Sequence, residues 1–166
     1  VETLAVLPLV NFTSTGAVED PLTVYVTSAL REQTQFKVLH SRQVADCLNY
    51  YEEFRLPLPL PEKARLLARR LGADVVVYGS VDEYSGYYPY RLGLSVDVVR
   101  VADERVLFES DAVYDAETIL SGSRRTFRTS QEFNRYACAR FVKEVFNPLA
   151  MEGERKRSGP FWRRYF

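Results

Sequence analysis

The chain has 166 residues, 46% of them hydrophobic, which is the length and composition of one globular domain with a core of its own. Its 22 Lys and Arg residues balance its 22 Asp and Glu residues, so the chain as a whole has no field that would attract nucleic acid or an anionic membrane. No apolar run approaches the roughly 20 residues of a membrane-spanning helix, and Val1 is not an initiator methionine, so we expect a processed or trimmed form.

The first part of the chain predicts two short strands on either side of a helix. The apolar run at residues 3–9 indicates a buried strand, and residues 36–39 indicate a second one. Between them, Asp20 is a suitable N-cap and Pro21 suits the first helical position. The apolar residues of this predicted helix recur on one face, at Leu22, Tyr25, Val26, Ala29 and Leu30.

Two further helices are predicted, with a proline-rich linker between them. Ser41 can cap the first, because serine is a favoured N-cap residue. The three prolines of RLPLPLPEK, residues 55–63, then interrupt the helical pattern. The next helix opens at Pro61 and Glu62, and it stops at Gly72, which suits the left-handed position after a helix.

The middle of the chain predicts an antiparallel meander of three strands. Residues 73–81, ADVVVYGSV, are apolar on both faces, as expected of a central strand with helices on each side. Apolar residues at every second position of 92–98 indicate a strand with one wetter face. A turn at residues 101–105 then leads to a third strand at residues 106–114.

These elements predict a single α/β domain with an α+β tendency, in which helices flank a mixed β-sheet that contains the meander. A last helix is expected over residues 130–146, and it should end at Asn147 and Pro148 because the residue before a proline disfavours helix. We therefore place the domain at residues 1–150 and a basic, aromatic tail at residues 151–166.

No set of residues in the sequence forms a recognisable catalytic or metal site. His40 is the only histidine, and a place at a helix entry or turn explains it better than a role in a catalytic triad. Two acidic pairs, Asp82–Glu83 and Glu52–Glu53, are adjacent in sequence, so their side chains should diverge and lie in solvent. We expect no cofactor and no metal, and we predict that the protein is not an enzyme.

The cysteines and one glycine also have structural interpretations. Cys47 and Cys138 fit neither a CxxC metal pattern nor a redox pair. Two buried free thiols are favoured over a disulfide, which would need adjacent Cβ atoms and an oxidising compartment. Gly79 lies in no phosphate-binding motif, and close packing against a helix or a bulge would explain it.

Four segments, in this order, resemble a family of bacterial envelope proteins. They are LAVLPLVNFT at the start, FKVLHSRQV after the first helix, ARRLGADVVVYGSVDEY in the middle and LSVDVVRVADERVLFES after it. Similar patterns occur in the amino-terminal domain of TolB and in the related lipoproteins CsgG, LpoB and PelC. The resemblance covers roughly residues 3–110 and implies the fold of that family.

Members of this family are periplasmic, are commonly lipid-anchored at the outer membrane, and act by assembly or binding. The resemblance therefore implies a non-enzymatic component of secretion or envelope assembly that oligomerises or docks on protein partners. We expect no nucleic-acid partner, in keeping with the balanced charge of the chain. An upstream lipidated cysteine would anchor it at the outer membrane. Two alternatives stay open: a monomeric docking module that regulates a periplasmic enzyme such as a peptidoglycan synthase, and an enzyme on an α/β scaffold.

The first candidate contact surface is an aromatic turn, YSGYYPY, between two predicted strands. Tyrosines offer a rigid apolar area together with a hydroxyl, as protein interfaces often require. Tyrosine is also common in strands, so the same side chains can pack across their own hairpin instead. The four tyrosines of this turn are Tyr84, Tyr87, Tyr88 and Tyr90.

Two further candidate surfaces are the loop after the first strand and the C-terminal tail. The loop carries Asn11 and Phe12 at a place where α/β folds often put binding groups. The tail mixes basic and aromatic residues, and contact with a neighbouring subunit would bury aromatic side chains that are costly to expose. A disordered or strapped-down terminus is the alternative. The candidate contacts of the tail are Arg157, Trp162, Arg163 and Phe166.

Overall fold

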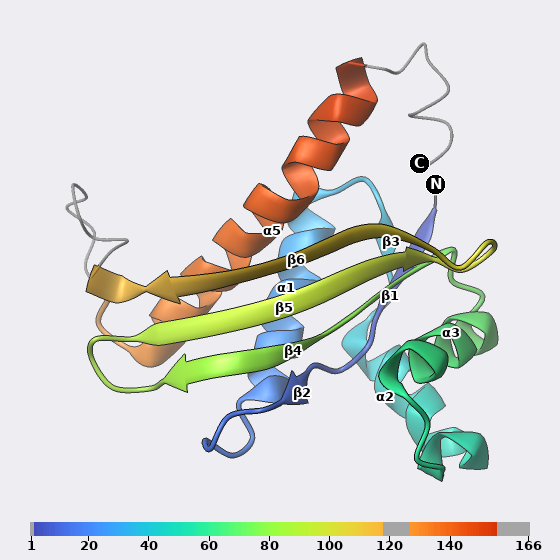
Figure 1. Cartoon of the computed structure of the whole chain (residues 1–166), viewed down its shortest axis with the longest axis horizontal. Helices are drawn as coiled ribbons and strands as arrows, with labels where there is room; N and C mark the ends of the chain where they lie inside the picture. Colours follow the sequence, from blue (N-terminus) through green and yellow to red (C-terminus); the bar gives the residue numbers. More distant parts are fainter. Residues whose placement is uncertain (1, 118–126, 156–166) are drawn as a thin grey trace.

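A six-stranded mixed sheet forms the centre of the fold in the computed structural model, which describes residues 2–117 and 127–155, with side chains up to Phe146. The elements in chain order are β1 (Thr3–Val6), β2 (Val10–Asn11), α1 (Glu19–Gln33), β3 (Lys37–Val38), α2 (Ser41–Tyr50), the 3-10 helix η1 (Glu52–Arg55), α3 (Leu60–Leu71), β4 (Val75–Ser85), β5 (Arg91–Arg100), β6 (Arg105–Asp115) and α5 (Ser130–Arg155) (Figure 1).

The strand order confirms the predicted sheet. It runs β3-β1-β4-β5-β6, and β2 also pairs with β4. The pairs β1–β3, β1–β4 and β2–β4 are parallel, whereas β4, β5 and β6 form the antiparallel meander. The predicted α/β fold, a mixed sheet with a meander and flanking helices, is thereby confirmed.

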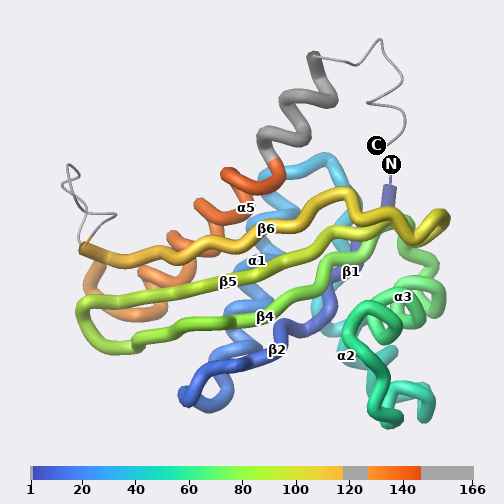
Figure 2. Tube along the Cα trace, in the orientation of Figure 1, coloured from blue at the N-terminus to red at the C-terminus, as the bar shows by residue number. Residues whose placement is uncertain are grey.

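Helices cover the two faces of this sheet unequally (Figure 1, Figure 2). On one face, α1 and α5 pack against the alternate apolar residues of 92–98, and Phe133 and Phe141 of α5 are fully buried there. On the other face, α2 and α3 pack against Val76, Tyr78 and Val99. These three residues lie at one end of the meander, so no described helix covers the hairpin end of that face.

The predicted N-cap of α1 is wrong. α1 begins at Glu19, one residue before Asp20, and Val18 occupies the cap position with helical backbone angles and no side-chain hydrogen bond to the helix. Val18 is buried in the core beneath α1. Tertiary packing therefore fixes the helical conformation upstream of Asp20. Asp20 lies in the first turn of α1, where its negative charge interacts favourably with the positive end of the helix dipole.

The cap of α2 is His40 rather than Ser41. His40 Nδ1 accepts a hydrogen bond from the Arg42 backbone N at 3.2 Å, and Gln43 Oε1 accepts one from the His40 backbone N at 3.0 Å. These two bonds form a capping box in which an imidazole nitrogen replaces the usual hydroxyl. The prediction that Ser41 caps this helix is wrong, and the interpretation of His40 as a helix-entry residue is confirmed.

The prediction that the last helix ends at Asn147 and Pro148 is also wrong, because α5 continues to Arg155. A proline removes one backbone hydrogen bond from a helix and disfavours it without forbidding it. Residues 151–155, which the sequence assigns to the tail, belong to α5. The four candidate tail contacts lie outside the described residues, and they are Arg157, Trp162, Arg163 and Phe166.

Gly79 marks a close approach between β4 and β5. A Cβ atom at this position would lie 2.0 Å from the Ser95 carbonyl oxygen and 2.9 Å from the Val96 Cα. Close packing is therefore the reason for the glycine, as predicted, but the neighbour is a strand and not a helix. The end of α3 agrees with the sequence, since Gly72 takes the left-handed conformation with φ of 68°.

Candidate functional site

The four tyrosines of the aromatic turn divide into two that anchor it and two that it presents. Tyr84 and Tyr90 are the anchors. The Tyr84 hydroxyl oxygen accepts a hydrogen bond from Asn134 Nδ2 of α5 at 3.1 Å. The Tyr90 ring stacks on Phe133 of α5, with ring centroids 5.7 Å apart and planes 25° apart. Both contacts fix the turn end of the β4–β5 hairpin to α5.

Tyr87 and Tyr88 are the presented residues, and we call them the tyrosine tip. Their exposed fractions are 88% and 62%. The turn that carries them is internally bonded, because the Ser85 hydroxyl donates to the Tyr87 carbonyl oxygen at 2.9 Å and the Tyr88 ring packs edge-on against Tyr90 at 5.9 Å. The tip therefore offers aromatic surface from a turn that is already ordered, which lowers the entropy cost of a contact.

The second candidate surface, the loop after β2, divides in the same way. Asn11 organises the loop: its Nδ2 donates to the Thr15 carbonyl oxygen at 2.6 Å and to Glu19 Oε2 at 3.1 Å, and its Oδ1 accepts from the Thr13 backbone N at 2.9 Å. Phe12, next to it, is 71% exposed. Asn11 thus ties the loop to the start of α1, and Phe12 is the side chain that a partner could reach.

Phe12 and the tyrosine tip lie at the same end of the sheet. β2 and β4 are parallel, and Asn11 pairs with Val81. The tip lies six to seven residues further along the hairpin than Val81, on the order of 20 Å at about 3.3 Å per residue. The two surfaces therefore face the same end of the molecule (Figure 1) without forming one continuous patch.

The face of the meander opposite α1 and α5 carries carboxylates that the sequence does not reveal. β4 has a bulge between its pairs with Leu94 and Gly93, and Asp82 is the extra residue. Asp82 accepts hydrogen bonds from the hydroxyls of Ser80, at 2.7 Å, and Ser95. Glu83 lies on the same face, so the prediction that these adjacent acids diverge is wrong: a bulge cancels the alternation of a strand.

Asp97, Glu109 and Asp111 extend this group across β5 and β6. Asp97 pairs with Glu109 in the sheet register, and both face away from α5. Burial raises the pKa of Asp97 and the nearby Glu109 charge adds to this, although a hydrogen bond with Tyr78 acts in the opposite direction. The acidic face, as we call it, consists of Asp82, Glu83, Asp97, Glu109 and Asp111.

The acidic face does not have the geometry of a metal centre. Within residues 2–117 and 127–155, no three His, Cys, Asp or Glu side chains are placed to hold a metal ion. Glu83 is ion-paired with Arg91 at 2.5 Å. By contrast, neither Glu109 nor Asp111 has a side-chain hydrogen bond or ion pair in the described part of the chain, so both are available to a basic partner.

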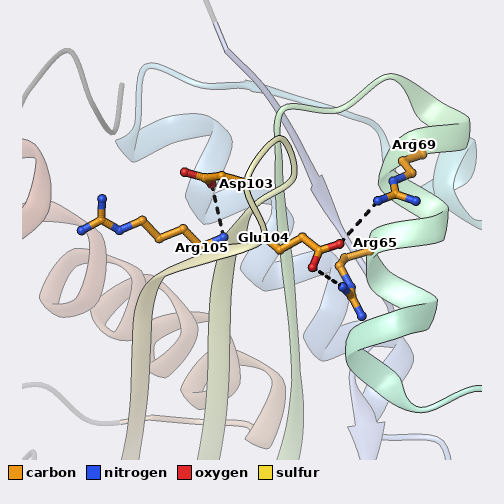
Figure 3. Close-up of polar contacts among 5 residues, drawn as sticks. All are labelled: Arg65, Arg69, Asp103, Glu104 and Arg105. Atoms are coloured by element: carbon orange, nitrogen blue, oxygen red, sulfur yellow. Dashed lines mark hydrogen bonds and ion pairs between the residues drawn. The ribbon is translucent and has the colours of Figure 1, made fainter.

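At the opposite end of the meander, the β5–β6 turn is clasped to α3 (Figure 3). Glu104 Oε2 lies 2.7 Å from Arg65 Nη1, and Glu104 Oε1 lies 3.5 Å from Arg69 Nη2. Within the turn, the Arg105 backbone N donates to Asp103 Oδ1 at 3.3 Å. A hollow of about 210 Å³ lies beside this clasp, lined by Glu62, Arg65, Leu66, Arg69 and Glu104. Glu104 is ion-paired with both arginines, so we assign the cluster a structural role.

The cysteines are buried and free, as predicted. Cys138 is fully buried in the core beneath α5, and burial raises the pKa of its thiol to about 12. Burial also raises the pKa of Cys47, on α2. Thiols in such surroundings are unreactive. None of the described helices is both long enough and apolar enough to span a membrane.

The fold defined by these elements is known from solved bacterial structures. The lipoprotein GNA1162 from Neisseria meningitidis gives a TM-score of 0.59 at 16% identity, over 90% of this chain and 99% of that one. A PelC dodecamer from Paraburkholderia phytofirmans gives 0.58 at 15% identity, over 87% of each chain. The LpoB C-terminal domain from Salmonella enterica gives 0.54 at 20% identity, over 68% and 82%.

At these identities the likeness establishes the fold alone, and it confirms the structural resemblance to PelC and LpoB that the sequence segments indicate. No protein-family model and no curated protein sequence matches the chain.

Proposed function

We propose that this protein is a non-enzymatic component of the bacterial envelope that acts through protein contacts, by forming an oligomer or by docking on a partner. The tyrosine tip is the observation that carries the proposal. It presents two exposed aromatic rings on a turn that Tyr84 and Tyr90 anchor to α5. Aromatic side chains held in this way are typical centres of protein interfaces. Phe12 and the tail residues Arg157, Trp162, Arg163 and Phe166 are proposed as further contacts.

Self-association is the form of this proposal that we favour. A protein with the same fold, PelC, forms a dodecamer. The proposed location is the periplasm, in association with the outer membrane. The same fold in the lipoprotein GNA1162 supports that location, together with the sequence resemblance to other envelope lipoproteins. A lipidated cysteine upstream of the domain would hold it at the membrane.

A monomeric docking module that regulates a periplasmic enzyme, such as a peptidoglycan synthase, is the second candidate function. The fold shared with LpoB and the sequence resemblance to it support this candidate. The tyrosine tip would then contact the enzyme rather than a second copy. The molar mass of the pure protein in solution distinguishes the two candidates.

Molar mass measured by light scattering after size exclusion tests the proposal. We expect the wild-type protein to form a discrete species several times heavier than its 19.1 kDa chain. Replacing the tip by Tyr87→Ala/Tyr88→Ala should raise the dissociation constant at least tenfold, because aromatic hot-spot residues each contribute about 2 kcal/mol or more.

Tyr50→Ala is the matched control, since Tyr50 is 79% exposed at the end of α2, away from the hairpin. It should leave the molar mass unchanged. If the tip variant and the control both keep the wild-type mass, the tip is not a subunit interface. A wild-type monomer at every protein concentration would contradict self-association and favour the docking module.

A further inference from the structure

The two edges of the sheet are unlike each other. One edge is β3, which has two residues, whereas the other is β6, which has 11. Within the described residues β6 pairs with β5 alone, so its outer side meets no other strand. A long edge strand presents backbone N–H and C=O groups to any further strand unless it is protected. The sheet can therefore be extended past β6.

The side chains of β6 restrict what can be added there. Glu109 and Asp111 lie near its middle, are exposed, and face away from α5. If β6 paired with β6 of a second copy in antiparallel register, acidic side chains would face acidic side chains, which is unfavourable. The opposite side of β6 carries Phe108 and Ala112, which are half-buried and packed on the main core, with Ser110 between them. The strand that fits this edge is basic and aromatic.

The chain itself contains such a segment. Residues 161–166, FWRRYF, combine strand-favouring aromatic residues with Arg163 and Arg164, and no acidic residue follows Glu154. Successive residues of a strand point to opposite faces. One of these two arginines would therefore face the acidic face in either orientation of the strand, together with two aromatic residues. The other arginine would lie with two aromatic residues on the side of Phe108 and Ala112.

We propose that residues 161–166 of a second copy add as a strand to the outer edge of β6, with an arginine against Glu109 and Asp111. α5 runs behind the sheet and passes the β6 edge (Figure 1). It continues from Phe146, which is buried, to Arg155, about 13 Å further along the helix axis. α5 lies on the face of the sheet opposite the acidic face. The strand is assigned to a second copy because the proposed function is self-association.

This contact is heterologous, because the tail of one copy meets the edge of the next, and repetition of such a contact builds a ring if it closes. It rests on the proposed function in its self-associating form, and it names the surfaces that join the copies. The contact is partly ionic between exposed groups, so the assembly should weaken as salt concentration rises.

Charge reversal on each side of the contact provides the test. One full-length variant, Glu109→Arg/Asp111→Arg, reverses the edge, and another, Arg163→Glu/Arg164→Glu, reverses the tail. Each variant alone should show at least a tenfold weaker association by light scattering. An equimolar mixture should recover the wild-type mass, because every basic edge then finds an acidic tail and every acidic edge finds a basic one.

The matched control is Asp46→Arg/Glu52→Arg, which makes the same charge change at exposed positions of α2 and η1 and should leave association unchanged. Circular dichroism checks that each variant is folded. Should the arginine edge variant unfold, Glu109→Gln/Asp111→Asn removes only charge and should weaken association in the same direction.

The outcomes separate this inference from the function on which it rests. Recovery on mixing supports the tail–β6 contact between copies. If the wild type is an oligomer and neither charge reversal weakens it, the tail–β6 contact is wrong but self-association remains. The same holds if both reversals weaken association and mixing the variants does not restore it. A wild-type protein that is monomeric at every concentration overturns both.

Discussion

Single residues determine the shape of the β4–β5 hairpin, which carries the tyrosine tip. Gly79 lets the β5 backbone approach β4 to a distance that no side chain would allow. Three residues later the Asp82 bulge turns two adjacent acids onto one face, and the hydroxyls of Ser80 and Ser95 hold Asp82 there. Gly79 therefore permits the close contact between β4 and β5, and the Asp82 bulge places Asp82 and Glu83 together on the acidic face.

Gly79→Ala is expected to destabilise the fold by about 1–3 kcal/mol or more, since the added Cβ would meet the Ser95 carbonyl oxygen and only a shift of β5 can relieve the clash. The free energy of unfolding from urea denaturation measures this. Gly16→Ala is the control, because nothing lies within 4 Å of a Cβ there, and it should change stability by less than about 0.5 kcal/mol. Equal effects of the two substitutions would refute the steric explanation.

At the scale of elements, a polar network joins α5 to the edge strand β6. The Tyr114 hydroxyl donates to Glu144 Oε2 at 2.8 Å, and Arg140 Nε donates to Glu144 Oε1 at 2.7 Å. Burial raises the pKa of Tyr114, and the bond to Glu144 raises it further. Burial alone would raise the pKa of Glu144 as well, but the bonds from Arg140 and Tyr114 leave it lowered. The network thus favours a charged Glu144 and fixes α5 against β6.

This lowered pKa predicts a pH dependence. The contribution of Glu144 to stability is present above its ordinary pKa of 4.5 and is lost as the pH falls through the lowered value in the folded state. Glu144→Gln should therefore be less stable than the wild type at pH 7, and the difference should shrink on acidification. Urea denaturation at several pH values measures it, with Glu32→Gln on α1 as the control. A difference that stays constant with pH would rule out this linkage.

At the scale of the whole molecule, the sheet separates two hydrophobic cores. The larger lies under α1 and α5 and contains Cys138, and the smaller lies under α2 and α3 and contains Cys47. Each core therefore carries one thiol, and burial raises the pKa of both thiols. The two cysteines are natural reporters of the cores in which they lie.

Thiol labelling of the native protein should modify Cys47 before Cys138. Cys47 is 9% exposed on a short helix, whereas Cys138 is fully buried on a long one. Cys138 should react only when the whole domain unfolds, because we expect local opening to leave this thiol buried. Its labelling rate should therefore not exceed the rate that global unfolding allows. Peptide mapping by mass spectrometry after timed labelling gives both rates, and denaturant provides the fully exposed control. Equal rates for the two thiols in the native protein would contradict this order.

Periodicity predicts most of this fold, because burial on one side of a strand or helix leaves a regular pattern. It finds the alternate apolar residues of β5 and the stop at Gly72. It does not predict the caps at Val18 and His40. Packing in the core sets the first, and a hydrogen bond to an imidazole nitrogen sets the second. The Asp82 bulge shows only in the pairing with β5. Likewise, the sequence does not distinguish the two anchoring tyrosines from the two exposed ones, because their contacts with α5 make the difference.

In the proposed function, the anchoring of the tyrosine tip separates the stability of the domain from the recognition of a partner. Tyr84 and Tyr90 pack on the main core, whereas the tip residues lie beyond both cores. Substitutions at Tyr87 or Tyr88 can therefore accumulate under selection for a different partner while the domain keeps its stability, as loops vary on the constant framework of an antibody. Under the proposed function, the same scaffold could in this way recognise different partners with little change in its interior.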